Sequence, residues 1–442
     1  MAKPIRFLIT LGFIFCYIDT AMGGAYEVPG FGAKAMSLGG AFIGLADDWT
    51  ASYYNPAGLA QLEGNSIGIT LFNINWNGAD RDSIANRDPQ ELMDRKLSIR
   101  RGDIFPRLYP SEPSRFSKRE VLHRFYQPSI GGYFHWKGYT VSLATYNPLG
   151  NFLDWRDIVL DPVTQAQILA SFYTRFFMAV SNLSLARKVT PKLSLGVGIN
   201  LIYSQFELDV YKRYQNTDPT LSSSDYYMDI EENGKGIGWE GVAGLLYKIN
   251  PDISVGAVYR SGSIIRMRGG AHIYQRIGKE VIVAEGSDYL RKFPQPPTWG
   301  IGIAYRPIPP LTLTADWQWT DWRVQKYHVS YDNPGDNLRN TNINLHWKIS
   351  ARYRFGVEYR VSPKMALRTG FYYDERGMPG EFLGFTTVAT VDRKEAAFGI
   401  SYDLGRWRLE GSYNASWGNQ NIHGVDQVLW NNMIHLGLAY RF

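Results

Sequence analysis

The chain ends in NMIHLGLAYRF, residues 432–442, and this stretch reads as one β-strand. Every second residue is aliphatic or aromatic: Ile434, Leu436, Leu438, Tyr440 and Phe442. Side chains two residues apart share one face of a strand, so this face is apolar along its whole length. A closed barrel in a membrane surrounds such a face with lipid and leaves no open sheet edge. We therefore expect the last strand to pair with the first, with Phe442 in the aromatic girdle on the periplasmic side.

The same alternation recurs through the chain and predicts an all-β protein, a 14-stranded antiparallel transmembrane β-barrel. Aromatic residues make up 14% of the chain and glycines number 44, a composition that suits strands and tight turns. An even number of strands lets a barrel close with both chain ends on one side. The alternating segments are 66–77, 129–136, 139–146, 174–189, 192–209, 236–249, 252–267, 297–306, 311–329, 348–361, 364–374, 394–403, 406–417 and 432–442.

Short and long connections alternate between these segments. The short ones are tight turns at 137–138, 190–191, 250–251, 306–310, 362–363 and 403–405. The long ones are charged, contain Pro and Gly, and include 78–128, 210–235, 331–347 and 375–393. Short turns in the periplasm and long loops outside are typical of outer-membrane barrels. A soluble β-sandwich has no reason to sort its connections in this way.

The N-terminus reads as a signal peptide covering residues 1–23. It has a basic start, an apolar core over 8–18 and a small-residue cleavage site at 21–23. An uncleaved anchor is the alternative, but the apolar core is shorter than a membrane-spanning helix. The only cysteine, Cys16, lies in this segment, so the exported chain is expected to make no disulfide. These features together predict the outer membrane of a Gram-negative cell as the location.

Residues 24–65 differ in composition from the predicted barrel at 66–442. A barrel of fourteen strands is too wide for its own side chains to fill, since about eight strands is the size at which they do so. A second short helix is expected over 49–53 and should end before Pro56. We expect residues 24–65 to fold into the lumen as a small plug, or hatch. Its apolar stripe at helical spacing comprises Ala35, Met36, Leu38, Ala41, Phe42 and Leu45.

The stretch AKAMSLGGAFIGLADDWTASYYNPAGLAQLEG, residues 33–64, resembles the hatch of the FadL/TodX family of outer-membrane transporters. Asn55, Pro56 and Ala57 match the hatch motif of that family. Later stretches such as NLSLARKVTPKLSLGVGINLIYSQFEL and FPQPPTWGIGIAYRP resemble its barrel, whereas the loop at 78–128 has no counterpart that we recognise. The resemblance implies uptake of hydrophobic small molecules, above all long-chain fatty acids, with aromatic or alkane hydrocarbons as the alternative.

In this family, substrate leaves the barrel sideways through a gap made by an inward kink of the third strand. Here the third strand runs into Asn147, Pro148 and Gly150. Pro148 lacks the N–H that a ladder needs, and Gly150 packs no side chain, so a kink is expected at this place. The alternative is that the strand ends at Tyr146 and that Pro148 opens the following loop.

Three arginines, Arg352, Arg354 and Arg360, alternate on the expected lumen face of the tenth strand. Charges at membrane depth need partners, so we expect these arginines to pair with other lumen charges and with the hatch. A second interpretation is that one of them holds a fatty-acid carboxylate by charge-assisted hydrogen bonds.

Other classes of protein fit the sequence less well. We find no catalytic constellation for a lipase, no spacing of metal ligands, no cofactor motif and no nucleic-acid motif. A diffusion porin would not be expected to carry a hatch. An adhesin stays open as an alternative, because the long exposed loops could bind a partner. The expected partners are a hydrophobic substrate, outer-membrane lipid and the barrel assembly machinery, which reads the strand ending in Phe442. A monomer is expected.

Overall fold

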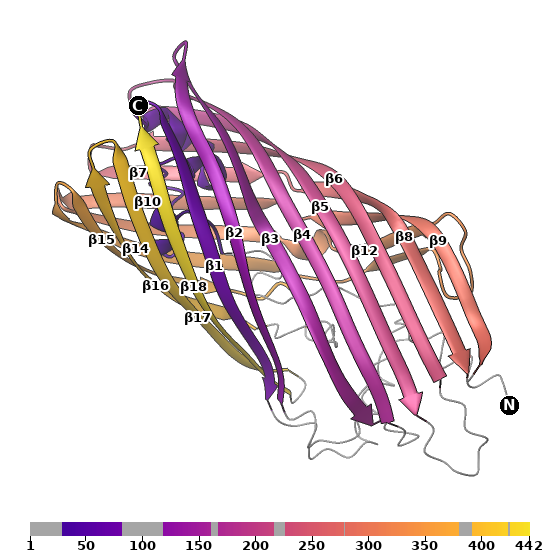
Figure 1. Ribbon diagram of the computed structural model, residues 1–442. Coiled ribbons are helices and arrows are strands. Elements are labelled where there is room, and N and C mark those ends of the chain that lie inside the picture. Colours follow the sequence, from indigo (N-terminus) through magenta and orange to yellow (C-terminus); the bar gives the residue numbers. More distant parts are fainter. Residues whose placement is uncertain are drawn as a thin grey trace.

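The computed structural model describes residues 29–81, 118–160, 167–215, 226–277, 279–379, 391–422 and 425–442. One antiparallel sheet of long, tilted strands curls into a barrel, with short helices inside one end (Figure 1). The strands are β1 (Ser66–Arg81), β2 (Lys118–Trp136), β3 (Tyr139–Leu160), β4 (Gln167–Lys188), β5 (Leu193–Gln215), β6 (Tyr226–Lys248), β7 (Ile253–Arg260), β8 (Ser263–Ile277), β9 (Glu280–Gln295), β10 (Thr298–Ile308), β11 (Leu311–Asp321), β12 (Lys326–Tyr331), β13 (Thr341–Asn344), β14 (Ile349–Ser362), β15 (Met365–Asp374), β16 (Arg393–Leu404), β17 (Trp407–Ile422) and β18 (Val425–Arg441).

The strands make fourteen spans of the wall, because four of the spans are each interrupted once. For example, β7 and β8 both pair with β6, at successive levels of the wall. The spans β9/β10, β11/β12 and β13/β14 are divided in the same way. Because β1 pairs with both β2 and β18, the sheet closes without an edge. The predicted 14-stranded antiparallel barrel is therefore confirmed.

The interruptions follow from local sequence. Gly262, with φ of +67°, separates β7 from β8, and Pro296-Pro297 separates β9 from β10. Proline cannot donate a ladder hydrogen bond, so two in succession end a strand. A short 3₁₀ helix, η3 (Trp322–Val324), separates β11 from β12.

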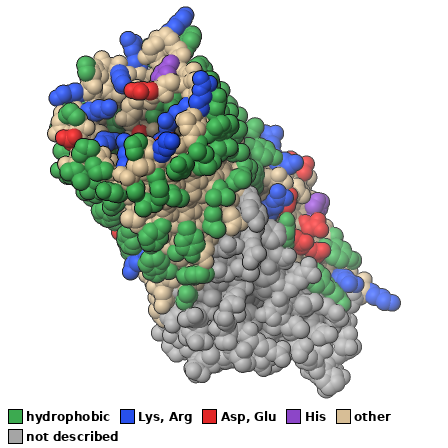
Figure 2. Space-filling model, turned by 60° about the vertical axis from the view of Figure 1, so that its left-hand side comes forward, with side chains coloured by type: hydrophobic (Ala, Val, Ile, Leu, Met, Phe, Trp, Pro, Cys, Tyr) green, Lys and Arg blue, Asp and Glu red, His purple; other side chains and the backbone are tan. Residues whose placement is uncertain are grey.

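The two faces of the wall carry different side chains. On β1, Ile67, Ile69 and Leu71 are exposed on the outer face, while Thr70 and Phe72 are buried on the inner face. The same alternation along the other strands produces a broad outer surface of apolar side chains (Figure 2). This pattern is what a barrel surrounded by lipid requires.

The short turns and the C-terminus lie at one end of the barrel (Figure 1). Lys137 and Gly138 both have positive φ, as a two-residue hairpin turn requires. The backbone of Phe442 exchanges two hydrogen bonds with Asn65, just before β1, at 3.0 and 3.3 Å. The predicted pairing of the last strand with the first is thus confirmed, and the Phe442 ring lies next to that of Tyr440.

Inside this end of the barrel lie the three short helices α2 (Ala33–Ser37), α3 (Ala51–Tyr54) and η1 (Pro56–Gln61). We use the name hatch below for residues 29–65. The expected helical stripe is wrong in extent, because α2 ends at Ser37, although all six stripe residues are buried. Two glycines with positive φ, Gly39 and Gly40, turn the chain out of the helix. No helix in the described ranges is long and apolar enough to cross a membrane.

Candidate functional site

Asn55, Pro56 and Ala57 lie where the hatch touches the wall. The Asn55 side chain accepts a hydrogen bond from Ala57 N at 3.1 Å, which caps η1. Its amide nitrogen donates to Ile43 O in the hatch and to Leu245 O in β6, both at 2.9 Å. Pro56 begins η1 rather than only ending α3, a position where its missing N–H costs nothing. The triplet therefore joins two parts of the hatch to the wall.

Two wall glycines make this contact possible. A Cβ on Gly244 of β6 would lie 2.1 Å from Asn55 Oδ1, and one on Gly196 of β5 would lie 2.4 Å from Ala57 N. Any larger residue at either position would push the triplet away from the wall. Close approach of two backbones is a common reason for glycine within a strand.

Asp316 on β11 forms a second anchor, which the sequence analysis did not identify. Its Oδ2 accepts hydrogen bonds from the backbone N–H groups of Phe42 and Ile43, at 2.6 and 2.8 Å. Ser254 on β7 donates to Gly44 O at 2.8 Å. The sequence indicates this anchor only by an acidic residue on the inward face of a strand. Its hydrogen-bond partners could not be identified from the sequence, because they are more than 270 residues away along the chain.

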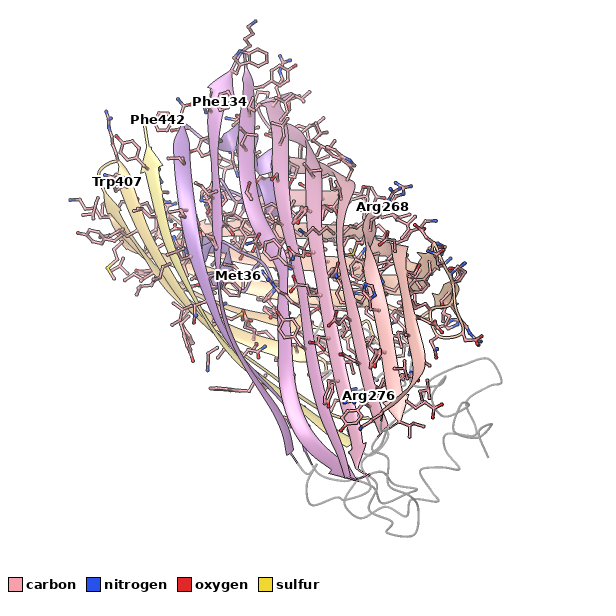
Figure 3. The ribbon with its side chains drawn as sticks, turned by 45° about the vertical axis from the view of Figure 1, so that its right-hand side comes forward. Met36, Phe134, Arg268, Arg276, Trp407 and Phe442 are labelled. Atoms are coloured by element: carbon pink, nitrogen blue, oxygen red, sulfur yellow. The ribbon has the colours of Figure 1, made fainter. Side chains whose placement is uncertain are left out.

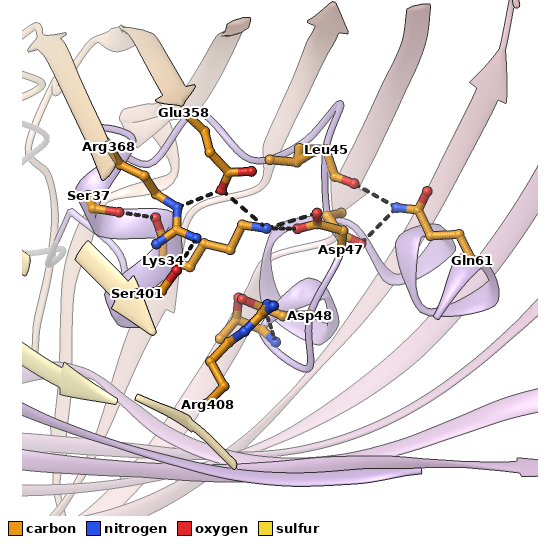
Figure 4. Close-up of polar contacts among 12 residues, drawn as sticks. Lys34, Ser37, Leu45, Asp47, Asp48, Gln61, Glu358, Arg368, Ser401 and Arg408 are labelled. Carbon is orange, nitrogen blue, oxygen red and sulfur yellow. Dashed lines mark hydrogen bonds and ion pairs between the residues drawn. The ribbon is translucent and has the colours of Figure 1, made fainter. Parts of the chain in front are cut away.

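A third anchor is the ionic network in Figure 4. Lys34 Nζ lies 2.7 Å from Asp47 in the hatch and 3.6 Å from Glu358 on β14. Glu358 in turn pairs with Arg368 of β15 at 2.6 Å. Burial raises the pKa of the adjacent Asp48 to about 6, and the charge of Glu410 adds to the shift. This side of the hatch is thus held by charge, whereas the triplet is held by the neutral hydrogen bonds of the Asn55 side chain and by close packing against the wall glycines.

The predicted kink residues lie at an irregularity of β3. In the β3–β4 ladder Tyr146 is opposite Val180 and Leu149 is opposite Met178, so β3 contains one extra residue. Asn147 and Pro148 lie inside this bulge, and Gly150 follows it in regular pairing with Phe177. The alternative that β3 ends at Tyr146 is wrong, because β3 continues to Leu160.

The seam between β2 and β3 is open beyond the bulge. Within the described residues these strands pair only from Trp136/Tyr139 to Ile130/Thr145. Farther out, β2 keeps its pairing with β1, and β3 keeps its pairing with β4. The wall therefore has an unpaired seam that begins next to Tyr146.

A pocket lies between the hatch and this bulge. It encloses about 720 Å³ including its open mouth. The lining is largely apolar and aromatic. Its members come from the hatch, from β3 to β7, from the break between β9 and β10 and from β11: Ile43, Tyr53, Tyr54, Tyr146, Pro148, Met178, Val180, Ile202, Glu240, Val258, Arg260, Gln295, Pro296, Thr298 and Gln318. Pro148 thus borders both the pocket and the bulge of the wall.

One ion pair lies in the pocket wall. Arg260 Nη1 is 3.4 Å from Glu240 Oε2, and both side chains are largely buried. The Arg260 guanidinium also donates to Tyr53 O and lies 4.4 Å from the centre of the Tyr53 ring. Because the charges of Arg260 and Glu240 balance, the pocket offers an apolar surface with one neutralised polar pair.

The three predicted arginines differ in their surroundings. Arg352 is buried and pairs with Asp374 at 2.8 Å, and Arg393 shares this carboxylate. Arg354 donates to Gln318 at 2.8 Å and to Pro29 O of the hatch at 3.4 Å. Arg360 is different, because its side chain is 59% exposed near the turns. Arg360 Nε nevertheless lies 3.7 Å from Glu358 Oε1, so this arginine pairs with a lumen carboxylate at the mouth of the barrel, whereas Arg352 and Arg354 lie deeper in the lumen.

A model of the family described as outer membrane protein transport protein (OMPP1/FadL/TodX) matches residues 164–408, more than half of the chain. The chain belongs to this family. The family resemblance is therefore confirmed by the barrel residues, and with it an outer-membrane β-barrel of a family of transport proteins.

Relatives of this FadL/TodX-family barrel share its fold at low identity. Outer membrane protein P1 of Haemophilus influenzae is 23% identical over 262 residues, which are 52% of this chain and 55% of that protein. The chain thus spans about half the length of this relative. A Pseudomonas aeruginosa FadL homologue of known crystal structure matches with a TM-score of 0.70 at 14% identity, over 94% of this chain and 99% of that chain. The Pseudomonas putida toluene transporter TodX matches with a TM-score of 0.67 at 15% identity, over 94% and 99%.

The described part of this FadL/TodX-family barrel holds no group of three or more His, Cys, Asp or Glu side chains suited to a metal ion. His435, the inward histidine of β18, is buried and its ring stacks on Phe72 at 4.5 Å between centroids. The polar groups of the lumen described above serve mainly to hold the hatch. The pocket and the seam are the features that remain for a ligand.

Proposed function

We propose that this barrel takes up hydrophobic small molecules from outside the cell and releases them sideways into the outer membrane. The observation that carries the proposal is the position of the pocket, which borders the β3 bulge where the β2–β3 seam begins. An apolar molecule that leaves through such a seam moves from pocket to lipid without exposing its surface to water. The hatch, held at the other side of the pocket, would close the direct path to the periplasm.

Long-chain fatty acids are the substrate class that we propose first. Arg260 is the basic residue of the pocket lining and could receive a carboxylate, as charge-assisted hydrogen bonds to guanidinium groups are strong. A bound carboxylate would have to share Arg260 with Glu240, so this site would favour a fatty acid over a neutral hydrocarbon only modestly.

Aromatic hydrocarbons are the second candidate. Three tyrosines, Tyr53, Tyr54 and Tyr146, line the pocket, and edge-to-face contacts with such rings favour a small aromatic ligand. A neutral ligand would leave the Arg260–Glu240 pair undisturbed. The likeness to the toluene transporter TodX in fold is compatible with this candidate.

Uptake of palmitate and of toluene into liposomes that contain the purified barrel tests the proposal. Uptake of neither compound above that of protein-free liposomes would overturn the proposed function. Arg260→Met separates the two candidates. It should lower palmitate uptake about tenfold, because the loss of one charge-assisted hydrogen bond weakens carboxylate binding by about that factor, and it should leave toluene uptake unchanged. Equal loss of both would show that Arg260 only supports the pocket.

Three further features belong to this proposal. Residues 1–23 would be removed on export, Phe442 would mark the last strand for the barrel assembly machinery, and the barrel would act as a monomer. The pairing of β1 with β18 within a single chain supports the last point, because the barrel closes without strands from a second chain.

A further inference from the structure

Four cations form a cluster on the outer face of the wall, away from the pocket and the hatch. Lys235 of β6 is directly opposite Arg268 of β8, and Arg266 of β8 is directly opposite Lys292 of β9. Between the two arginines, Met267 points inward and is buried. Arg268 projects from the outer side of the barrel (Figure 3). We call these four residues the outer cationic cluster.

This arrangement is unfavourable as it stands. Directly opposed side chains on an antiparallel ladder have Cβ atoms about 4.5–5.5 Å apart, and like charges at this distance destabilise the pair. In the parts of the chain that the structure describes, none of the four side chains takes part in an ion pair or hydrogen bond. The nearest carboxylates on this face lie farther from the turns. Glu207 of β5 and Asp288 of β9 are each one outward position beyond the residues opposite Lys235 and Arg268, and Glu231 of β6 is two outward positions beyond Lys235.

The cluster lies at the edge of the apolar surface. Directly below it, toward the turns, Ile237, Trp239 and Ile264 are at least half exposed on the outer face. Ten residues of β6 separate Ile237 from Tyr247 near the turns. At about 3.4 Å per residue and a tilt of ~35–45°, they rise roughly 25 Å, which is the height of the lipid-facing band of such barrels. The cluster is therefore level with the headgroups of the extracellular leaflet.

We propose that the outer cationic cluster binds the phosphate groups of an anionic lipid in the extracellular leaflet. Two opposed cation pairs present ammonium and guanidinium donors at the spacing of one strand pair, and guanidinium groups suit phosphate oxygens. A lipid fits better than a soluble anion, because acyl chains would cover Ile264 and Trp239 directly below. The chemistry fits a lipid with more than one phosphate and several acyl chains, such as lipid A. His328 of β12, directly opposite Lys292, extends the row by one titratable group.

The test measures thermal unfolding of the purified full chain in detergent, by loss of heat-modifiable gel mobility, with increasing lipid A. The variant replaces all four cluster residues with glutamine: Lys235→Gln, Arg266→Gln, Arg268→Gln and Lys292→Gln. We expect lipid A to raise the unfolding temperature of the unchanged protein. Each cation near an anionic lipid surface strengthens binding about fivefold, so the loss of all four should weaken it several hundredfold. The variant should therefore need several hundredfold more lipid A for half-saturation at low salt. Without lipid A the variant should unfold at a higher temperature than the unchanged protein, because the like-charge pairs are gone.

A matched control removes the same charge at the other end of the barrel, through Lys137→Gln, Lys188→Gln, Lys192→Gln and Lys364→Gln. This control should respond to lipid A as the unchanged protein does. If the four-residue variant does not assemble, the pair Arg268→Gln and Lys292→Gln keeps one cation in each ladder and should show a loss of about twentyfold or more. An equal response in variant and unchanged protein, or an equal loss in the control, would overturn the proposal. So would an equal stabilisation by inorganic phosphate at the same phosphorus concentration.

Discussion

Deleting Pro148 is expected to close the seam between β2 and β3. The bulge contains one extra residue, because three steps along β3 from Tyr146 to Leu149 match two steps along β4 from Val180 to Met178. Removal of Pro148 alone restores one-to-one pairing and leaves the pairing from Leu149 onward unchanged. It also removes a residue that cannot donate to a ladder. β3 should then continue beside β2 instead of turning away from it.

The magnitude follows from the hydrogen bonds gained. If only about four further residue pairs join the β2–β3 ladder, about four backbone hydrogen bonds form, each worth ~1 kcal/mol net. Parting the strands then costs ~4 kcal/mol more. Since about 1.4 kcal/mol changes a rate tenfold, a transport step that needs the open seam should slow roughly a thousandfold.

The assay is uptake of labelled palmitate and toluene into liposomes, per heat-modifiable barrel, together with ligand binding in detergent. We expect uptake to fall to background while binding in the pocket weakens by less than tenfold. The matched control is deletion of Pro307, which lies in the one-residue bulge of β10 between Tyr305 and Ile308 near the turns. Uptake at the original rate by correctly assembled barrels lacking Pro148 would refute the assignment of the exit to this seam.

Three other predictions concern the hatch. Deleting residues 55–57 should leave surface abundance and heat-modifiability normal, since all strands follow the triplet. The deletion should impair uptake of hydrophobic substrate and let small hydrophilic dyes pass. Unchanged uptake and unchanged dye exclusion would mean that the triplet is only a helix boundary. Gly244→Val should have a similar effect, because its Cβ would lie 2.1 Å from Asn55 Oδ1, whereas Gly241→Val on the outer face, with the nearest atom 3.8 Å away, should be silent in the same dye-leak assay. The raised pKa of Asp48, about 6, means that the folded hatch binds a proton more tightly than the unfolded chain, so this residue favours the folded hatch at low pH and loses that effect as the pH rises from about 4 to 6. After correction for the intrinsic pH dependence, hydrogen exchange near Thr50 should therefore be slower at pH 5 than at pH 7, and Asp48→Asn should remove this difference; an unchanged difference would assign the pH response to another group.

The sequence by itself located the part of most strands nearest the turns, because alternation with a period of two is a local property. It did not give their full lengths: β2 begins at Lys118 and β6 at Tyr226, inside the predicted loops 78–128 and 210–235, and β9 lies outside the predicted segments. The terminal segment 432–442 was sufficient to predict a closing strand, and β18 pairs with β1 as expected. The tight turns were equally readable, since Lys137-Gly138 can form its turn without help from distant residues. The hatch motif could be located from its family resemblance, and its division into α3 and η1 follows the proline.

Only the tertiary structure decided which residues of these elements contact one another. Arg360 is on the face that the alternation of its strand predicts and pairs with Glu358, but its exposure of 59% depends on how far the lumen extends toward the turns. Three other features depend on the register between distant chain segments. They are the hydrogen bonds from Phe42 and Ile43 to Asp316, the extra residue of β3 at Pro148, and the position of Lys235 opposite Arg268. Register is set by pairing across the sheet and by closure of the whole ring, and no local pattern contains it.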